Sequence, residues 1–385
     1  MGGPGLDADQ DKGLHIRACA RWERRDRDLV CIPKIRQIWA AGYSEPRMPP
    51  PRAFGRRLRR VRRVGTVGTV TGPAAEGARV AWEQVPFGVR AAIEDVCGSR
   101  VVAAWTQPGG FSPGLAARVR CADGARFFVK AVSAQANPDT PRLHRQEGRV
   151  LAALEPLIAG RQLPIPRLHG IVDRKPWIAL ILQDVDGRQP ALPWQTEELE
   201  QVVGVLDRMA EALTPAPVAA PTAAERLGGA FTGWRTLAAT PDRGQLDPWS
   251  RAHLDRLAQI EATWAEHATG DTLLHADIRA DNLLLTGHGP VVVDWPWACQ
   301  GAAVFDLILF APSVAMQGGP PPADLLARSR HGRAARRDTV TALVCGLAGY
   351  LTERSLRPPP LGLPTVRSFQ AAQGAVARRW LAGLI

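Results

Sequence analysis

The chain has no apolar run long enough to cross a membrane as a helix. Its best candidate, Ala302 to Met316, is interrupted by Asp306 and Pro312 and falls short of the roughly 18 residues that a bilayer requires. The first residues also lack the apolar segment of a secretory signal, since three aspartates occur within residues 7–11. Hydrophobic residues nevertheless make up 45% of the 385 residues, enough for a sizeable core. We therefore expect a folded cytoplasmic protein without a membrane partner.

Signatures of two common binding sites are also missing. The six cysteines show neither C-x-x-C spacing nor a neighbouring pair of histidines, which argues against a zinc site and a disulfide framework. A Gly-x-x-x-x-Gly-Lys-Ser/Thr sequence is absent too, which argues against a P-loop nucleotide site. We expect reduced and mostly buried thiols at Cys19, Cys31, Cys97, Cys121, Cys299 and Cys345.

Basic residues are plentiful but concentrated near the beginning of the chain. Of the net charge of +11, residues 1–75 contribute +9, from 16 Lys+Arg and 7 Asp+Glu, so the remainder is close to neutral. The densest run, residues 56–63, has no interleaved aromatic residue, which is typical of a solvated tail. We predict that residues 1–78 form a disordered basic extension, or follow from a start codon placed too far upstream. No nucleic-acid partner is expected; a nucleic-acid or membrane binder acting through residues 50–65 is the alternative.

Short apolar segments separated by turn residues predict a small antiparallel sheet in residues 79–186. One helix is predicted over residues 89–96, ending at Gly98, and another over Pro141–Leu157. Asp123-Gly124 is a strong hairpin signal. The expected strands are Val101–Thr106, Ala116–Cys121, Arg126–Val132, Leu168–Val172 and Trp177–Leu182.

The pattern changes to helices beyond Gly187. Pro-rich breaks at residues 214–221 and 358–360 separate them. We therefore predict an α+β fold of two lobes, a small antiparallel β N-lobe (residues 79–186) and a helical C-lobe (residues 187–385). The expected C-lobe helices are Glu197–Leu213, Pro248–His267, Thr339–Thr352 and Thr365–Leu384.

The most informative segment spans residues 273–295. An apolar strand leads into His275 and Asp277, Asn282 follows five residues after that aspartate, and a second apolar strand ends at Asp294. This His-x-Asp-x-x-x-x-Asn order resembles the catalytic loop of protein kinases, in which a later aspartate binds metal. Each residue alone has a structural explanation as a core histidine, a turn or a cap. Their joint occurrence in this order favours phosphoryl transfer.

Phosphoryl transfer needs positioning and charge neutralisation more than covalent chemistry. Asp277 has the place of the carboxylate that orients the attacking hydroxyl and accepts its proton, and His275 would hold the catalytic loop. Asn282 and Asp294 supply oxygen ligands of the kind that Mg²⁺ prefers. Arg279 could stabilise charge on the transferred phosphate, or instead form a surface salt bridge with a nearby carboxylate.

The predicted N-lobe contains a matching nucleotide site. Lys130 lies in an apolar strand and is one of only four lysines, beside 44 arginines. A lysine in such a strand is costly unless it is paired, and Glu147 on the following helix is the expected partner. Such a pair positions the α- and β-phosphates in kinases. An edge-strand lysine that reaches solvent is the alternative.

Two further segments complete the predicted nucleotide site. The turn at residues 108–114, with Gly110 and Ser112, is rich enough in glycine for backbone N–H groups to approach phosphate oxygens, although a plain hairpin loop fits it equally well. Residues 183–187 follow an apolar strand where the lobes meet. In kinase-like folds this linker holds adenine, here through the backbone of Gln183 and Val185.

Together these segments resemble the aminoglycoside phosphotransferase family, which also contains choline, homoserine and fructosamine kinases. The resemblance covers residues 101–384. It implies ATP or GTP as donor, Mg²⁺ as cofactor and a small hydroxylated acceptor, and a structural role for Asp306 at a helix start. Two residues depart from the family pattern. Ala276 replaces the usual Gly, and this should be tolerated because both residues are small. Arg279 stands where many members have His.

The acceptor and the oligomeric state stay open. A cationic aminoglycoside would need a cluster of carboxylates in the C-lobe. A kinase of another small metabolite is the closest alternative, and an inert kinase-like binding protein is another, although such a protein should lack at least one residue of the catalytic set. The carboxylates considered for an aminoglycoside site are Glu197, Glu198, Glu200, Glu211 and Glu225.

Overall fold

The computed structural model describes residues 73, 78–111, 114–160, 163–240 and 244–385. The predicted basic extension lies almost entirely outside these residues, and so does Ser112. Within the described part of the chain, no helix combines the length and apolar character that a membrane span requires. The described cysteines are free and buried, as predicted, at Cys97, Cys121, Cys299 and Cys345.

Five antiparallel strands form the sheet of the N-lobe in the order β1-β2-β3-β5-β4. The turn between β2 and β3 holds Gly124 at a φ of 90°, a conformation that suits glycine and explains the hairpin signal there. The five predicted strands are confirmed, with small differences at their ends. The strands are β1 (Val101–Thr106), β2 (Leu115–Cys121), β3 (Arg126–Ser133), β4 (Leu168–Arg174) and β5 (Trp177–Gln183).

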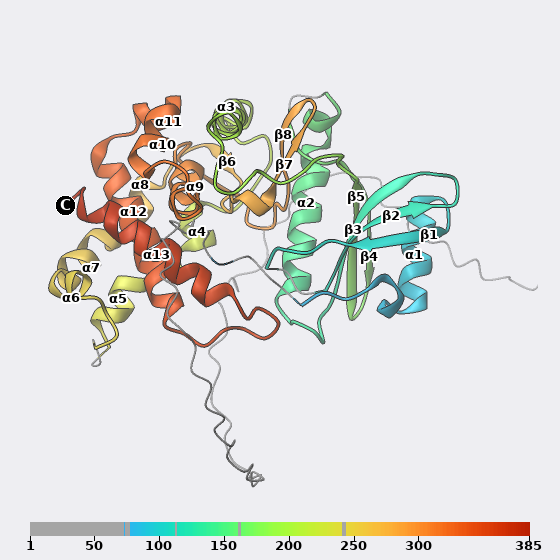
Figure 1. Cartoon of the computed structure of the whole chain (residues 1–385), viewed down its shortest axis with the longest axis horizontal. Helices are drawn as coiled ribbons and strands as arrows, with labels where there is room; N and C mark the ends of the chain where they lie inside the picture. Colours follow the sequence, from blue (N-terminus) through green and yellow to red (C-terminus); the bar gives the residue numbers. More distant parts are fainter. Residues whose placement is uncertain (1–72, 74–77, 112–113, 161–162, 241–243) are drawn as a thin grey trace, which may run out of the picture.

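One helix covers each face of this sheet. Because side chains alternate along a strand, Ala179 and Ile181 of β5 pack in the cluster of α1 (Phe87–Cys97), whereas Leu180 and Leu182 pack in the cluster of α2 (Thr140–Ala159). In Figure 1, α2 lies between the sheet and the helical lobe, and α1 lies on the outer side. The cluster around α2 also continues into the helical lobe. The sheet face that meets α2 therefore faces the rest of the protein.

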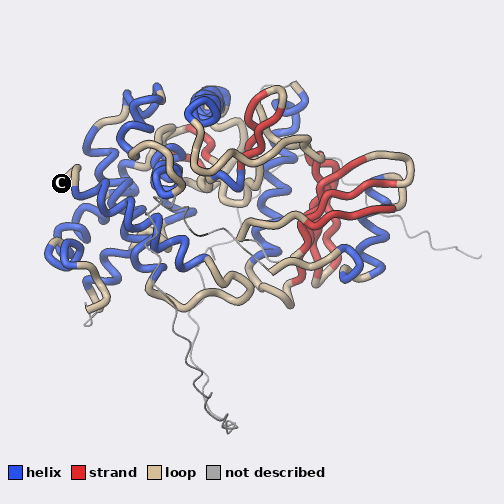
Figure 2. The backbone as a smooth tube through the Cα atoms, viewed as in Figure 1, coloured by secondary structure: helices blue, strands red, loops and turns tan. Residues whose placement is uncertain are grey.

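Helices dominate the C-lobe, as predicted (Figure 2). The long ones are α3 (Thr196–Ala212), α9 (Phe305–Met316), α12 (Arg337–Ser355) and α13 (Val366–Ala382). The predicted helix start at Phe305 is confirmed. Four shorter helices carry too few turns for a periodic pattern and were not predicted: α4 (Ala223–Leu227), α5 (Gly233–Ala238), α10 (Pro322–Arg328) and α11 (Arg330–Ala334).

The single helix predicted over residues 248–267 is wrong. The segment forms α6 (Pro248–Ala252), α7 (Leu254–Ala262) and α8 (Trp264–His267). The second break falls at Thr263, whose hydroxyl donates to the Ile260 carbonyl at 2.9 Å. Such local side-chain hydrogen bonds compete with regular helix formation.

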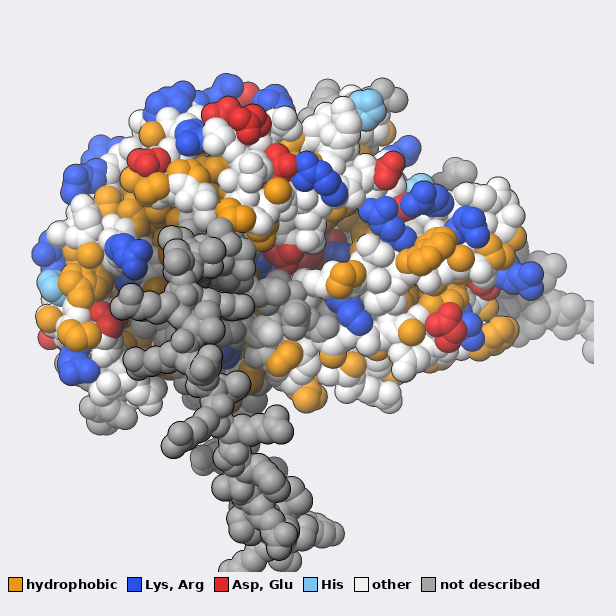
Figure 3. Space-filling view, viewed as in Figure 1, with side chains coloured by type: hydrophobic (Ala, Val, Ile, Leu, Met, Phe, Trp, Pro, Cys, Tyr) orange, Lys and Arg blue, Asp and Glu red, His pale blue; other side chains and the backbone are white. Residues whose placement is uncertain are grey.

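Two short strand pairs lie where the lobes meet. β6 (Thr272–Leu274) pairs with β9 (Cys299–Gly301), and β7 (Leu283–Thr286) pairs with β8 (Gly289–Val292). A 3-10 turn, η2 (Ala280–Asn282), precedes β7, and another, η1 (Trp82–Gln84), precedes α1. Figure 3 shows acidic side chains in a hollow between the two lobes, close to this region. The predicted two-lobed kinase-like fold is confirmed.

Candidate active site

The predicted catalytic loop, residues 275–282, connects β6 to β7. Asp306, in the first turn of α9, accepts the backbone N–H groups of His275 at 2.8 Å and Ala276 at 2.6 Å. Burial raises the pKa of Asp306 to about 6, although both amides favour its charged form. Ala276 has a left-handed φ of 62°, which costs a residue other than glycine about 1–2 kcal/mol. A carboxylate from α9 thus holds the loop in a strained backbone conformation.

His275 is fully buried beneath the loop. Its Nε2 lies 3.0 Å from the Val293 carbonyl, and its Nδ1 lies 3.2 Å from the Asp277 N–H. These partners make Nε2 the donor and Nδ1 the acceptor, so the ring is neutral. Burial lowers the pKa of His275 to about 4, and the ring packs edge-on against Trp295 at 4.8 Å. His275 therefore ties the loop to the end of β8.

Asp277 and Arg279 form an ion pair at the centre of the loop. Arg279 donates to Asp277 Oδ1 at 2.6 Å, and its other nitrogens bind the two oxygens of Asp281 at 3.0 and 2.9 Å. The side chain of Arg279 is only 13% exposed, so these contacts are not surface salt bridges. Burial raises the pKa of Asp277 to about 6, while Arg279 acts against this shift. The predicted salt bridge with Asp281 is thus present but buried, and the role of Arg279 toward the transferred phosphate stays a prediction.

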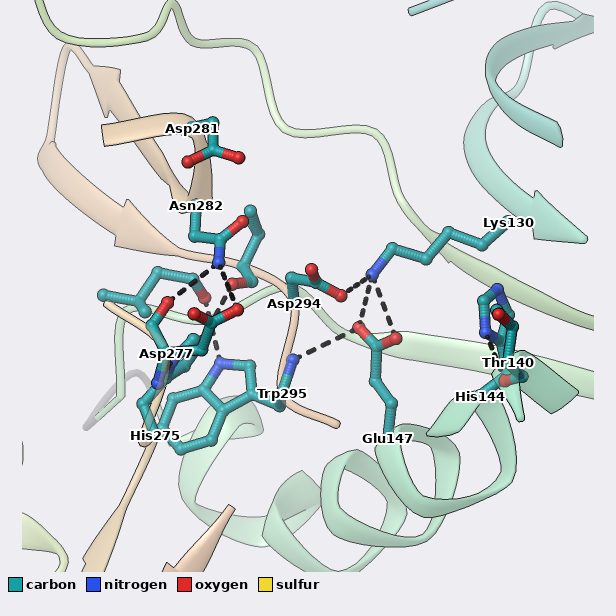
Figure 4. Close-up of polar contacts among 12 residues, drawn as sticks. Lys130, Thr140, His144, Glu147, His275, Asp277, Asp281, Asn282, Asp294 and Trp295 are labelled. Atoms are coloured by element: carbon teal, nitrogen blue, oxygen red, sulfur yellow. Dashed lines mark hydrogen bonds and ion pairs between the residues drawn. The ribbon is translucent and has the colours of Figure 1, made fainter. Parts of the chain in front are cut away.

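Asn282 and Asp294 present oxygen atoms beside Asp277. The Asn282 amide nitrogen donates to the Asp277 backbone carbonyl at 2.9 Å and to its Oδ2 at 3.4 Å, which assigns the amide oxygen to the opposite side (Figure 4). Asp294, at a φ of 70°, binds Lys130 through Oδ1 only. Among the described residues no group of three or more His, Cys, Asp or Glu could cage a metal. The pair fits Mg²⁺, which often takes one or two protein oxygens and completes its shell with water and phosphates.

Lys130 joins the two lobes. Its Nζ contacts both carboxylate oxygens of Glu147, at 2.8 and 2.9 Å, and Asp294 Oδ1 at 2.6 Å (Figure 4). Val129 and Ala131 pack in the cluster of α1, so alternation turns Lys130 toward α2 and Glu147. Burial disfavours its charged form, but Asp294 and Glu147 outweigh this and raise the pKa of Lys130. The predicted Lys130–Glu147 contact is thus present, and Lys130 does not reach solvent as an edge-strand lysine.

The other predicted nucleotide-binding residues lie in the β1–β2 turn and in the linker after β5. Gly110 adopts a φ of 77° in the turn between β1 and β2. The Gln183 N–H already donates to the Arg167 carbonyl at 2.9 Å, and the Val185 carbonyl accepts from Arg118 at 3.0 Å. Among the residues that the structure describes, none accepts a hydrogen bond from the Val185 N–H. The contact of the Val185 backbone with a nucleotide base stays a prediction.

Phe111, in the turn between β1 and β2, is a site residue that the sequence analysis missed. Its ring lies 5.3 Å from the Arg279 guanidinium and 5.3 Å from the ring of Phe369 on α13. The turn therefore contacts both the catalytic loop and the C-terminal helix. An aromatic residue among glycines was visible in the sequence, but no spacing rule connects it with residues so far along the chain.

A two-lobed fold with a lysine–glutamate pair in one lobe and a His-x-Asp loop in the other is the arrangement of kinase-like phosphotransferases. The chain belongs to the phosphotransferase enzyme family, whose model matches residues 110–339. No curated protein sequence matches the chain significantly.

Solved structures have the same fold at low sequence identity. A complex of the choline kinase LicA with AMP is 12% identical, with a TM-score of 0.51, and covers 77% of this chain and 98% of its own. A thermostable aminoglycoside phosphotransferase APH(4)-Ia, in a ternary complex with ADP and hygromycin B, is 16% identical, with a TM-score of 0.50, and covers 76% of this chain and 98% of its own. Choline kinase LicA from Streptococcus pneumoniae is also similar, at 12% identity and a TM-score of 0.50, covering 75% and 98%.

Proposed function

We propose that this protein transfers the γ-phosphate of ATP or GTP to a hydroxyl of a small molecule, with Mg²⁺ as cofactor. One observation carries the proposal: Lys130 of the N-lobe meets Asp294 of the C-lobe at 2.6 Å, across 164 residues of sequence. The contact joins the candidate phosphate-binding lysine to the candidate metal-binding aspartate. An inert binding protein would have no need to keep this pair together with Asp277 and Asn282.

Asp277 is the proposed base. It orients the acceptor hydroxyl and takes its proton as the new bond from oxygen to the γ-phosphorus forms and the bond between that phosphorus and the leaving nucleoside diphosphate breaks. Arg279, held by Asp281, adds a permanent positive charge beside this point. His275 and Asp306 act as positioning residues, since they contact the loop and lie behind it.

Asn282 and Asp294 would hold Mg²⁺, which supplies positive charge to the phosphate oxygens when bound. Lys130 would bind the α- and β-phosphates, with Glu147 fixing its position. Gly110 and Ser112 of the β1–β2 turn would approach the phosphates, and the Val185 backbone the base. The likeness to structures that contain AMP or ADP supports a nucleotide donor.

The proposed division of labour follows the two lobes. Residues 79–186 form the N-lobe, which would bind the nucleotide, and residues 187–385 form the C-lobe, which would hold the catalytic loop and the acceptor. One of the similar structures is described as an aminoglycoside phosphotransferase and another as a choline kinase. A small hydroxylated acceptor is the element they share.

The test is Mg²⁺-dependent phosphate transfer by the wild type and by Asp277→Asn. We expect the variant to lose about 10²–10⁴-fold in transfer rate, the usual contribution of a general base, with nucleotide affinity retained. Asp324→Asn, at an exposed position on α10, is the matched control and should behave as the wild type. Absence of nucleotide binding by the wild type, measured by titration calorimetry, would refute the proposal.

A further inference from the structure

The corner between α12 and α13 carries an excess of arginine. Residues 350–370 contain three arginines and a single acidic residue, Glu353. Glu353 is already engaged, because it forms ion pairs with Arg357 and, at 3.7 Å, with Arg354. The corner therefore keeps a net positive charge after its internal ion pairs are formed.

A chain of side-chain contacts connects this corner to the catalytic loop. Phe111 lies between Arg279 and Phe369 of α13. Next to Phe369, Gln370 donates to the Tyr350 hydroxyl at 3.3 Å. Charges on both sides of Tyr350 affect the pKa of its hydroxyl. Burial raises this pKa, Arg354 acts to lower it, and Asp277 acts to raise it. The arginine corner thus lies within electrostatic range of the candidate base.

Two arginines of the corner lie near Tyr350. The Arg354 guanidinium lies 6.0 Å from the Tyr350 ring centroid. Arg367 donates to the Gln370 side chain at 2.8 Å and to the Pro358 carbonyl at 3.1 Å, and no described carboxylate lies within ion-pair distance of it. It is the second residue of α13, where the helix dipole disfavours a cation. Helix stability therefore does not account for Arg367.

The carboxylates considered for a cationic acceptor are mostly engaged elsewhere. Glu198 pairs with Arg188, and Glu211 pairs with Arg330. Glu200 lies 3.7 Å from Arg328. Glu225 closes the capping box at the start of α4. Neither Glu225 nor Glu197, which lies on the exposed face of α3, forms an ion pair with a described residue. These side chains do not form a cluster that would bind an aminoglycoside.

We propose that the acceptor is a small hydroxylated oxyanion, a carboxylate or a phosphate monoester, whose anionic group binds Arg354 and Arg367 while its hydroxyl faces Asp277. This inference rests on the proposed phosphotransferase function. Planar guanidinium groups bind carboxylate and phosphate oxygens through paired hydrogen bonds. The acceptor charge is thereby opposite to that of an aminoglycoside or choline.

A panel of related sugars that differ in charge tests the inference. Gluconate and glucose 6-phosphate represent the two anionic classes, glucose is neutral, and glucosamine and kanamycin are cationic. Titration calorimetry with Mg²⁺ and ATP first measures nucleotide binding, independently of any acceptor. Phosphate transfer to each compound, and its effect on the thermal midpoint of the protein with Mg²⁺ and a non-hydrolysable ATP analogue, then report the acceptor preference.

We expect the anionic sugars to be preferred, and their relative kcat/KM values distinguish a carboxylate from a phosphate. Arg367→Gln and Arg354→Gln should each lower kcat/KM for the preferred anion by roughly 10-fold or more, as expected for a hydrogen bond to a charged group. Nucleotide affinity should not change. Arg379→Gln, at an exposed position on the same helix α13, is the control and should leave kcat/KM unchanged.

The outcomes separate the two proposals. Preference for glucosamine or kanamycin, or no effect of any compound on a protein that binds ATP, would overturn the anionic acceptor and leave nucleotide binding intact. Loss of kcat/KM in Arg379→Gln equal to that in Arg367→Gln would overturn it too, because a general effect of positive charge would then explain the result. Failure of the wild type to bind ATP would overturn the phosphotransferase function itself.

Discussion

Replacing Lys130 should destabilise the protein more than replacing its partner Glu147. The ammonium group of Lys130 serves two carboxylates, and the side chains of Lys130, Glu147 and Asp294 are only 14%, 2% and 24% exposed. Lys130→Met leaves both carboxylates without this cation, which should cost about 3–5 kcal/mol of unfolding free energy. Glu147→Gln preserves the contact between Lys130 and Asp294, so its cost should be about 1–3 kcal/mol.

The double variant Lys130→Met/Glu147→Gln measures the coupling between these residues. Once Lys130 is gone, removing the negative charge of Glu147 also removes a buried charge that lacks its partner. The double variant should therefore be more stable than the sum of the single effects predicts, by about 2 kcal/mol. Urea unfolding of the nucleotide-free protein gives the three free energies, with the slope of each transition confirming that the compared states are the same.

A second ion pair on the same helix α2 is the matched control. Arg145 binds Asp173 through two contacts of 2.7 Å, but the side chains are 32% and 40% exposed. Exposed pairs of this kind couple by about 1 kcal/mol or less. Additivity within about 0.5 kcal/mol for Lys130 and Glu147, or a larger loss in Glu147→Gln than in Lys130→Met, would refute the argument from burial.

Two substitutions and a pH profile probe the catalytic loop. Asp306→Asn replaces one acceptor oxygen with a donor facing a backbone N–H, so urea unfolding should show a loss of about 2 kcal/mol; an unchanged midpoint would contradict the anchoring role. Ala276→Gly should stabilise the protein by about 0.5 kcal/mol, because relief of the strained φ exceeds the extra chain entropy of glycine, and a lower thermal midpoint would speak against strain. Because Asp277 must be ionised to accept a proton and its pKa is raised to about 6, kcat/KM should fall roughly tenfold per pH unit below that value and level off above it; a flat profile would exclude Asp277 as the titrating base.

Local patterns in the sequence were sufficient for most of the regular structure. The short apolar runs of β3 and β5 and the Asp123-Gly124 turn are features of neighbouring residues, so they could be recognised without tertiary information. Apolar spacing misled at residues 248–267, where the side chain of Thr263 takes part in ending α7. Ala276 was considered by side-chain size alone, whereas its φ of 62° and its hydrogen bond to Asp306 govern the effect of this residue.

By itself, the sequence determined the chemical groups of the site and their order, because Asp277, Asn282 and Asp294 lie close together along the chain. It also indicated Glu147 as the partner of Lys130, since a buried lysine requires a carboxylate. Only the tertiary structure decided that Lys130 also meets Asp294, and that Phe111 links Arg279 to Phe369. The same holds for the arginine corner and its position beside the catalytic loop. These contacts join residues of different lobes or distant helices, and spacing along the chain carries no information about how such surfaces pack together.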